Sequence, residues 1–401
     1  MTGTLRPEIF DDIDSLPSCW DIPARNNIFL SRKYLRALHR SAPANMQLHY
    51  LLVYRGEEPV AVAISQFLDM SRLKSFGERD NRLKTAIRTF VFRRFASNVL
   101  ILGNNMLTGQ NAFAIVKGED PKEVVLAFAI AIRQLTSKFT AMGRKPHLTI
   151  WKDFAHTEMH AFEQKGFTSY YPFSTQPNMV LNIPSKWKNE ADYVAALHKK
   201  YRDQYKRARK KASGLLKRRM ELDEIGVRRE RINELYHNVA ANAPFNTFYL
   251  HEDHFYALKR ELGEHFLVYG YFDGDRLVGF NTIIRNGRDI DTYFLGYDEV
   301  AQRECMLYLN MLYDMLGYSV KNGYDRIIFA RTALEIKSSV GAEPEIMYGL
   351  IRHSNRLINS QIHRLFGYFE PDVPWTKRHP FKQEEARQPS SAAEESQFQA
   401  G

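Results

Sequence analysis

The most constraining feature of this sequence is a strand–turn–strand pattern that occurs twice, about 220 residues apart. Residues 47–67 read QLHYLLVYRGEEPVAVAISQF, and residues 265–284 read HFLVYGYFDGDRLVGFNTII. Each copy has an apolar strand, a glycine turn at Gly56 or Gly274 and a second apolar strand, and an Ala-Leu pair lies in the segment before each copy. A repeated pattern of this kind predicts two copies of one fold.

The second copy predicts a mixed sheet with a helix packed on it. Both alternating sets of side chains in 266–272 are apolar, which is typical of a strand covered on both faces. Gly274 supplies the positive φ that a tight hairpin needs, and Gly287 marks a second hairpin. The order continues with a strand, a helix and a strand at 289–297, 303–321 and 326–330. These elements together make an α+β arrangement.

The first copy predicts the same order of elements. Ser31 is expected to open a helix, and the elements run over 29–39, 47–67, 98–103, 121–141 and 147–151. After Gly166-Phe167, an extended stretch at 179–183 is expected to close this unit. We therefore divide the chain into a first unit, a basic connecting helix, a second unit that we expect to be catalytic, and a disordered tail rich in Gln, Glu, Ser and Ala, at 1–185, 186–225, 226–375 and 376–401.

The composition favours a cytoplasmic protein. With 401 residues and 44% apolar side chains, the chain can fill two cores. Its two cysteines are too few for a disulfide framework or a zinc site, so we expect no metal. Residues 1–14 have neither a basic start nor an apolar run, so we expect no signal peptide. The most apolar run, 124–132, is too short to span a bilayer, which leaves contact with the inner membrane face as the alternative.

The net charge of +10 comes from one segment. Between Lys199 and Arg219 eleven Lys and Arg accompany one acid, whereas the rest of the chain has 45 basic and 45 acidic residues. A local basic segment points to one anionic contact, either tRNA or an anionic lipid. Tyr201 and Tyr205 within it are suited to stacking on bases. A solvated helix between two domains is the alternative, and the lopsided charge favours anion binding.

A second basic segment, Arg72–Phe95, carries eight Lys and Arg and two acids. Leu83, Ile87, Phe90 and Val91 share one face if this segment is helical. A basic amphipathic helix can lie on an anionic membrane surface, so peripheral membrane contact is one prediction. An apolar stripe packed on its own domain is the other, and we favour it because such stripes mostly face a core.

Residues in the second copy resemble the GNAT acyltransferase superfamily, and in particular the second half of Fem-type aminoacyl transferases and related proteins with two fused GNAT units. The likeness is carried by Tyr297, Tyr308, Tyr313, Gly323 and the motif Lys337-Ser-Ser-Val-Gly341 after the fifth strand. The basic segment adds Tyr201-Arg202 and Lys206-Arg207-Ala208, which are similar to the join between the halves of Fem-type proteins. The resemblance implies an α+β fold of two tandem GNAT-like units, with mixed sheets flanked by helices.

The resemblance also implies a function. It is that of an N-acyltransferase, which moves an acyl or aminoacyl group onto an amine. In a GNAT role the donor is acyl-CoA and the acceptor is a small molecule. In a Fem-type role the donor is aminoacyl-tRNA and the acceptor is a cell-envelope precursor. No tightly bound cofactor is expected. The rival from another class is a non-catalytic protein that binds an anionic partner on a degenerate acyltransferase fold, with Lys337 and Tyr297 buried away from any cleft.

Acyl transfer to an amine needs a neutral amine, a polarised carbonyl and alignment of the two. We predict catalytic roles for Lys337, Tyr297 and Asp298. Lys337 stabilises the oxyanion or binds a donor phosphate, as the resemblance implies. Tyr297 donates a hydrogen bond or a proton, and Asp298 orients the amine. The structural alternatives are an ordinary surface lysine, aromatic packing and an Asp cap on the next helix.

We predict substrate contacts where the fifth strand ends, because ligands of open α/β sheets bind at the carboxyl ends of strands. The predicted contacts are Arg331, Thr332, Glu335 and Gly341, with Tyr293 from the fourth strand and Lys206 and Arg207 from the basic helix. Glu335 is also a candidate base. The alternatives are a simple strand end with a helix cap and a lone exposed glutamate.

The resemblance places a glycine-rich phosphate loop after the fourth strand, but this sequence has few glycines there. Residues 296–304 read GYDEVAQRE, and three acids near a helix N-terminus repel a CoA pyrophosphate. The matching part of the first copy, GNNMLTG at 103–109, is roomier. The sequence therefore argues against standard CoA binding in the second copy and leaves the first copy open.

Overall fold

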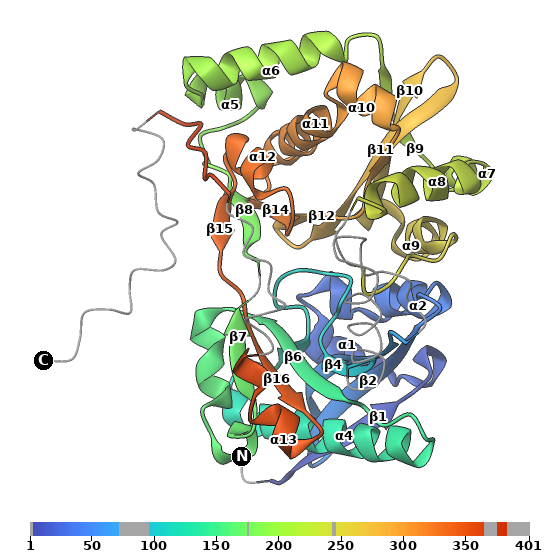
Figure 1. Ribbon diagram of the computed structural model, residues 1–401, viewed down its shortest axis with the longest axis vertical. Helices are drawn as coiled ribbons and strands as arrows, with labels where there is room; N and C mark the ends of the chain where they lie inside the picture. The colour runs from blue at the N-terminus through green and yellow to red at the C-terminus, as the bar shows by residue number, and fades with distance from the viewer. Residues whose placement is uncertain (1–2, 72–95, 175, 243–245, 365–374, 383–401) are drawn as a thin grey trace, which may run out of the picture.

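The computed structural model describes residues 3–71, 96–174, 176–242, 246–364 and 375–382. They form two lobes stacked along the long axis of the molecule, and each lobe is built on one mixed sheet (Figure 1). The amphipathic helix expected at 72–95 lies outside the described residues, as does the tail beyond residue 382.

The first sheet has the strand order β1-β2-β3-β4-β6-β16-β7, with β5 paired to β3. Only β4 and β6 are parallel neighbours among these strands. The strands are β1 (Leu5–Phe10), β2 (Met46–Arg55), β3 (Glu58–Asp69), β4 (Asn98–Leu102), β5 (Phe113–Ile115), β6 (Leu148–Phe154), β7 (Tyr171–Ser174) and β16 (Tyr348–His353). The α-helices of this unit are α1 (Asp21–Ala24), α2 (Arg32–Arg40), α4 (Pro121–Ala141) and α13 (Arg356–Asn359).

The second sheet has the order β15-β8-β14-β12-β11-β10-β9, with β13 paired to β11. Only β12 and β14 are parallel neighbours among its strands. The strands are β8 (Asn178–Asn182), β9 (Leu216–Met220), β10 (Phe266–Asp273), β11 (Arg276–Asn286), β12 (Asp289–Thr292), β13 (Gly296–Tyr297), β14 (Arg326–Ala330) and β15 (Glu343–Glu345). The α-helices are α5 (Glu190–Ala196), α6 (Lys199–Lys211), α7 (Leu222–Val227), α8 (Arg229–Ala240), α9 (His254–Leu262), α10 (Glu299–Cys305), α11 (Leu307–Lys321) and α12 (Leu334–Ser339).

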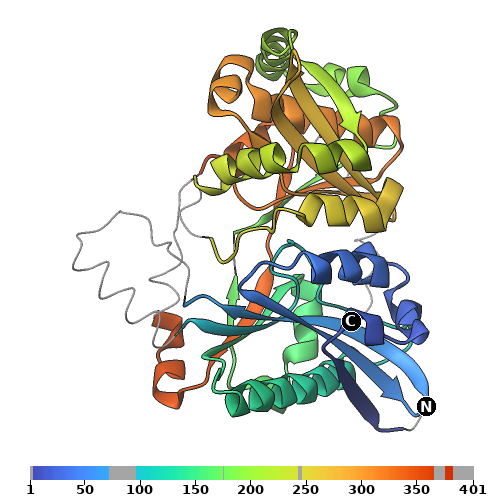
Figure 2. The same ribbon diagram turned by 90° about the vertical axis from the view of Figure 1, so that its right-hand side faces the viewer.

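The predicted repeat is confirmed as two equivalent hairpins. The β2–β3 hairpin turns at Gly56 with φ 62°, and the β10–β11 hairpin turns at Gly274 with φ 57°. In each hairpin the register shifts near the turn, and the extra, bulged residue is in the second strand: Val60 in one hairpin and Val278 in the other. Helices α2 and α9 precede the hairpins and pack against each other, which joins the two units in one apolar core (Figure 1 and Figure 2).

The two units exchange strands. β8 follows the first unit in the chain but lies in the second sheet, between β14 and β15. β16 follows the second unit but lies in the first sheet, between β6 and β7. The prediction that 179–183 closes the first unit is therefore wrong, and neither residue 185 nor residue 375 separates the two sheets. An apolar alternation identifies a strand, but it does not say which sheet the strand joins.

Two predicted helices are broken in the structure. The helix expected at 303–321 is α10 followed by α11, and Met306 between them has a left-handed φ of 50°. The basic connecting helix expected at 186–225 consists of α5 and α6, then the edge strand β9, which pairs with β10, and finally α7. Part of the basic segment therefore belongs to the second sheet.

Helix α4 is the one helix in the described part of the chain that is long and apolar enough to cross a membrane. Half of its most apolar window is buried inside the protein, and its buried side chains belong to the core of the first unit. The apolar stretch is longer than the run 124–132 on which the sequence expectation rested.

Candidate active site

In each unit the parallel strand pair separates at its carboxyl end. β4 and β6 are paired as far as Leu102 and Trp151, and β12 and β14 as far as Asp291 and Ile328. Beyond this point β13 pairs with β11, and the end of β14 pairs with β8. Main-chain N–H and C=O groups become available where parallel strands part, and ligands of open α/β sheets bind at that end.

The backbone is strained at the ends of β14 and β6. Ala330, Thr332 and Ala333 have φ angles of 59°, 67° and 47°, and Asp153 at the end of β6 has a φ of 69°. A non-glycine residue in this region costs about 1 kcal/mol or more, and such residues gather at functional sites. Asp153 and Ala330 are equivalent in the repeat, because each follows the last residue of the parallel pairing by two positions. Both strand ends are therefore candidates for function.

Lys337 on α12 reaches this strained turn. Its side chain is 4% exposed, and Nζ donates to the main-chain oxygens of Ala330 (3.2 Å) and Arg331 (2.5 Å). Burial lowers the pKa of Lys337 to about 7. An amine with this pKa is partly neutral at neutral pH, and its protonated form has one more N–H to donate. The predicted role as an oxyanion donor is compatible with this placement.

Arg331 joins the two units at the same place. Its guanidinium pairs with Asp153 of the first unit, and Nε donates to the main-chain oxygen of Gln176 (3.1 Å). Asp153 is 3% exposed and also pairs with Lys152 (2.7 Å). The ends of β14 and β6 therefore meet through a buried carboxylate between two cations. Sequence reasoning missed Asp153 and Lys152, although both follow a predicted strand end.

Lys152 on β6 is a second buried lysine at the end of a parallel strand pair. Its side chain is 8% exposed, and Nζ donates to the main-chain oxygens of Asn104 (3.3 Å) and Leu107 (3.2 Å). Burial lowers its pKa as well. A Cβ on Gly103 would lie 2.9 Å from Cγ of Lys152, so the lysine stem fills the space that the sequence suggested was open at 103–109.

Asp298 is held by neighbouring groups, and the Tyr297 ring packs against Tyr308. Asp298 caps α10, because Oδ1 accepts from the backbone N–H groups of Val300 (3.0 Å) and Ala301 (3.2 Å), and Oδ2 pairs with Arg276 (2.7 Å). These N–H groups and arginines hold the pKa of Asp298 below its usual value despite partial burial. Burial raises the pKa of Tyr297. The cap interpretation of Asp298 is confirmed.

Tyr293 lies at the boundary between the units. His254 links it to the first unit: Nε2 is 2.9 Å from the Tyr293 hydroxyl, and Nδ1 is 3.0 Å from Oγ of Ser41 at the end of α2. Tyr34 on α2 adds a hydrogen bond to the same hydroxyl. Tyr293 therefore helps to join the units, which sequence reasoning did not foresee.

The remaining predicted contacts near β14 are held by the C-terminal segment. Glu335 is exposed and pairs with Arg378, which lowers the pKa of the Glu335 carboxyl. Gly341 has φ 105°, and the ring of Phe381 lies directly where a side chain at 341 would be. Glycine is needed at this position for close packing.

Neither helix that the resemblance places at a phosphate site has a free N-terminus. α10 is capped by Asp298. α4, its equivalent in the first unit, begins at Pro121 and is capped by Asp120, which accepts from the N–H of Lys122 (2.9 Å). At both helices a carboxylate therefore occupies N–H groups of the first turn, where a pyrophosphate would be bound.

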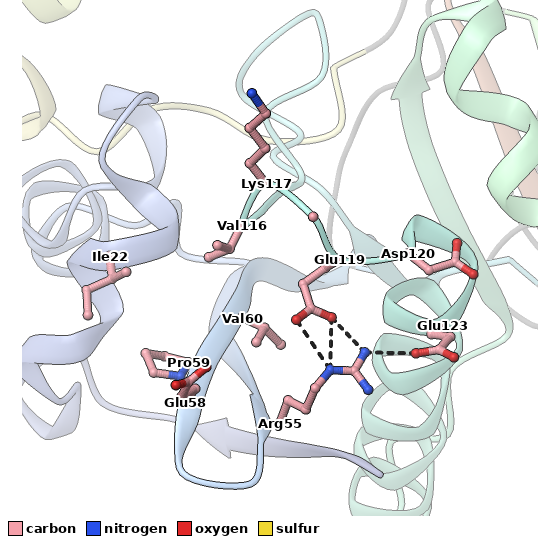
Figure 3. A pocket seen from close by; sticks show the side chains of 11 residues that line it. Ile22, Arg55, Glu58, Pro59, Val60, Val116, Lys117, Glu119, Asp120 and Glu123 are labelled. Atoms are coloured by element: carbon pink, nitrogen blue, oxygen red, sulfur yellow. Dashed lines mark hydrogen bonds and ion pairs between the residues drawn. The ribbon is translucent and has the colours of Figure 1, made fainter. Parts of the chain in front are cut away.

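A cavity of about 590 Å³ lies beside the start of α4 (Figure 3). Arg55 at the β2–β3 turn reaches across it to Glu119 (2.6 Å) and Glu123 (2.8 Å). The other lining residues also come from the first unit, at 22, 58–60, 116–118 and 120. The cavity contains none of the predicted site residues.

Helix α6 divides the basic segment into two faces. Arg209 turns inward and pairs with Glu190 and with Asp314 (2.8 Å). The exposed face carries six basic side chains that have no ion-pair partner among the described residues: Lys199, Lys200, Lys206, Arg207, Lys210 and Lys211. Figure 1 shows α6 at the outer end of the second unit. Lys206 and Arg207 are thus placed for an external contact, away from the first unit.

No protein-family model matches this chain, and no curated protein sequence matches it. Among solved structures, the chain is similar to FemX, with 11% identity, a TM-score of 0.50, and coverage of 89% of this chain and 99% of FemX. The fold is that of two tandem GNAT-like units. The resemblance predicted from the sequence, a tandem GNAT-like fold of the Fem type, is confirmed at the level of the fold.

Two further solved structures are similar over most of their length. A tandem GNAT protein from the clavulanic acid biosynthesis pathway has 9% identity, a TM-score of 0.49, and coverage of 88% of this chain and 99% of its own. A protein described as L-PGS from Bacillus licheniformis has 13% identity, a TM-score of 0.45, and coverage of 84% and 96%.

Proposed function

We propose that this protein is an N-acyltransferase that moves an acyl or aminoacyl group onto an amine where β12 and β14 part. The observation that carries the proposal is Lys337, a buried lysine with a pKa of about 7 that is held against a strained strand end. Groups whose pKa is shifted by burial cluster at active sites, and ligands of open α/β sheets bind at the carboxyl ends of strands. The fold shared with FemX supports the same chemistry.

In the proposed step the acceptor nitrogen attacks the acyl carbon, a C–N bond forms, and the bond from that carbon to the donor oxygen or sulfur breaks. The carbonyl oxygen carries negative charge in between. The third N–H of protonated Lys337 stabilises it, together with main-chain N–H groups of the strained turn. Arg331, fixed by Asp153, holds the donor or the acceptor beside them.

We propose aminoacyl-tRNA over acyl-CoA as the donor. Both helix N-termini at which a CoA pyrophosphate would be expected are capped by aspartates, Asp120 and Asp298. The exposed basic face of α6, which includes Lys206 and Arg207, suits the phosphates of tRNA. The acceptor would be an amine of a cell-envelope precursor or a small molecule, and the protein would act in the cytoplasm or at the inner membrane face.

A second candidate is a non-catalytic anion-binding protein on the same fold. The burial of Lys337 favours it, because its amine is enclosed and already donates to two main-chain oxygens. In that case Lys337 only stabilises the turn at Ala330 and Arg331.

The test measures transfer from charged tRNA and from acyl-CoA to a panel of amines by mass spectrometry. Lys337→Met keeps the side-chain volume and removes the amine, and we expect kcat to fall about 100-fold or more. Lys382→Met is the matched control, since exposed Lys382 also donates to a main-chain oxygen, that of Ala195 (2.8 Å). Equal rates for wild type and Lys337→Met would remove Lys337 from the mechanism. tRNA retention without any transfer would favour the anion-binding protein.

A further inference from the structure

A buried carboxylate without a full set of partners lies beside the proposed site. Asp291 on β12 is 5% exposed, and its Oδ2 has no hydrogen-bond partner among the described residues. The carboxylate receives one side-chain hydrogen bond, from Asn286, whose own oxygen accepts from the N–H of Ile28 in the first unit (3.0 Å). A buried acceptor that lacks a donor is rare in a folded protein and calls for a donor that binds there.

Asp291 faces the boundary between the two units. Its neighbour Ile290 packs in the core beneath α11, so Asp291 points to the other face of the sheet. Ile284, directly opposite on β11, belongs to the core shared with the first unit. The carboxylate is also close enough to Tyr34 of the first unit to raise the pKa of that hydroxyl.

The charges around Asp291 are mostly negative. Asp289 lies two residues before it on β12, and Arg326 on the neighbouring strand β14 is the cation that the described residues place near both. Arg326 pairs with Asp289 (2.5 Å), not with Asp291. Burial, together with Asp289, raises the pKa of Asp291 to about 7. Two carboxylates with one arginine leave a net negative charge, which attracts a cation to this face of the sheet.

Asp291 is also near the strained end of β14. It pairs with Ile328, two residues before Ala330, whose oxygen binds Lys337. From strand spacing and rise, the Cα atoms of Asp291 and Ala330 are about 8 Å apart. Lys337 reaches the strand end from α12, beside the core beneath α11, whereas Asp291 lies on the opposite face. An acceptor amine bound on one face of the sheet can therefore meet an acyl donor bound on the other face, at the point where the strands part.

We propose that Asp291 binds the ammonium group of the acceptor and takes a proton from it before attack. Asp289 helps to draw the cation to this face, and Oδ2 of Asp291 accepts the N–H that it lacks in the free protein. The proton moves from nitrogen to Oδ2 and leaves a neutral amine, whose lone pair forms the C–N bond. The second N–H proton is lost after attack, to the departing oxygen or sulfur.

This inference rests on the proposed acyl transfer and adds the acceptor class, a primary ammonium, and the residue that prepares it. A proton acceptor works best when its pKa is near the working pH. With Asp291 as base and protonated Lys337 as oxyanion donor, the rate requires one group deprotonated and the other protonated, which gives a bell-shaped pH profile.

The first test needs no activity. Wild-type protein labelled with ¹³C at aspartate Cγ is titrated with methylammonium and followed by NMR, and Asp291→Asn identifies the resonance. We expect a saturable shift of that resonance and a lower pKa for it as methylammonium binds. An Asp291 resonance that does not respond to methylammonium overturns the proposal.

The second test uses transfer rates. Asp291→Asn should lower kcat/KM about 100-fold or more and remove the limb of the profile on the acidic side. Donor binding should not change, because the donor lies on the other face. Asp325→Asn, which removes an exposed pair with Arg288 (2.6 Å), is the control and should transfer at the wild-type rate. A loss of less than about tenfold with an unchanged profile overturns the proposal.

The experiments distinguish a failure of the proposed acyl transfer from a failure of the proposed role of Asp291. If wild type transfers from neither charged tRNA nor acyl-CoA, the proposed function is wrong, and the methylammonium titration still decides whether Asp291 binds an amine. If wild type transfers and Asp291→Asn does so equally well, only the role of Asp291 is wrong.

Discussion

His254 offers a direct test of the joint between the two units. The side chain is fully buried, with Nδ1 against Ser41 (3.0 Å) and Nε2 against Tyr293 (2.9 Å). Burial lowers its pKa from 6.5 to about 3. Below pH 6.5 the unfolded chain therefore binds a proton that the folded protein does not, and stability falls as the pH falls.

The size of the effect follows from this difference. At pH 5 the unfolded histidine lies 1.5 units below its pKa, so proton binding stabilises the unfolded chain by RT ln(1 + 10^1.5), about 2 kcal/mol. The result does not depend on the folded pKa as long as that value is well below 5. His254→Asn removes the titrating group, and its destabilising effect should therefore be about 2 kcal/mol smaller at pH 5 than at pH 8.

The assay is urea unfolding of both proteins between pH 8 and pH 5, which gives the free energy of unfolding at each pH. The difference between the proteins cancels the other titrating groups. Asn105→Ala is the control, because it removes a non-titrating contact between the units, the donation from Nδ2 to Oγ1 of Thr247 (2.7 Å). If His254→Asn costs the same at both pH values while the control behaves as expected, the histidine titrates in the folded protein and the burial argument is refuted.

Three further predictions concern charged side chains. Asp291→Asn should raise the free energy of unfolding at pH 8 by up to about 4 kcal/mol. The reason is that a carboxyl whose pKa rises from 3.8 to about 7 on folding destabilises the protein above pH 7. The gain in stability should vanish near pH 4. Asp153→Ala should lower the free energy of unfolding in urea by about 3 kcal/mol, because it leaves two partly or fully buried basic side chains without a carboxylate. Asp325→Ala is the control at an exposed ion pair and should lower it by less than about 1 kcal/mol. Lys206→Glu with Arg207→Glu should weaken tRNA binding and reduce its salt dependence without changing Tm, and binding at the wild-type level would exclude this face of α6.

Much of the local structure follows from the sequence. The helix predicted at 121–141 and the strand predicted at 326–330 have those bounds in α4 and β14. Both hairpins were predicted from apolar strands and from glycine at the turns, and a helix was predicted before the first of them. These features depend on neighbours within a few residues, so the order of amino acids contains the information.

The candidate site was predicted only in part. Lys337 and Arg331 follow a predicted strand end, and the structure brings both to the strained turn after β14. Asp298 turned out to be a helix cap, and Tyr293 joins the units. Asp153 was not predicted, because its partner Arg331 is 178 residues away and nothing local distinguishes the carboxylate from an exposed one.

By itself, the sequence determined two copies of one α+β unit, with their strands, turns and basic helix, because each of these depends on a local pattern of apolar, glycine and charged residues. The tertiary structure alone decided that β8 and β16 change places between the sheets, that Asp153 and Arg331 meet, and that Asp291 is buried with its Oδ2 unpartnered. Pairing between distant strands and the burial of a charge depend on which surfaces meet, and residues far apart in the chain supply those surfaces.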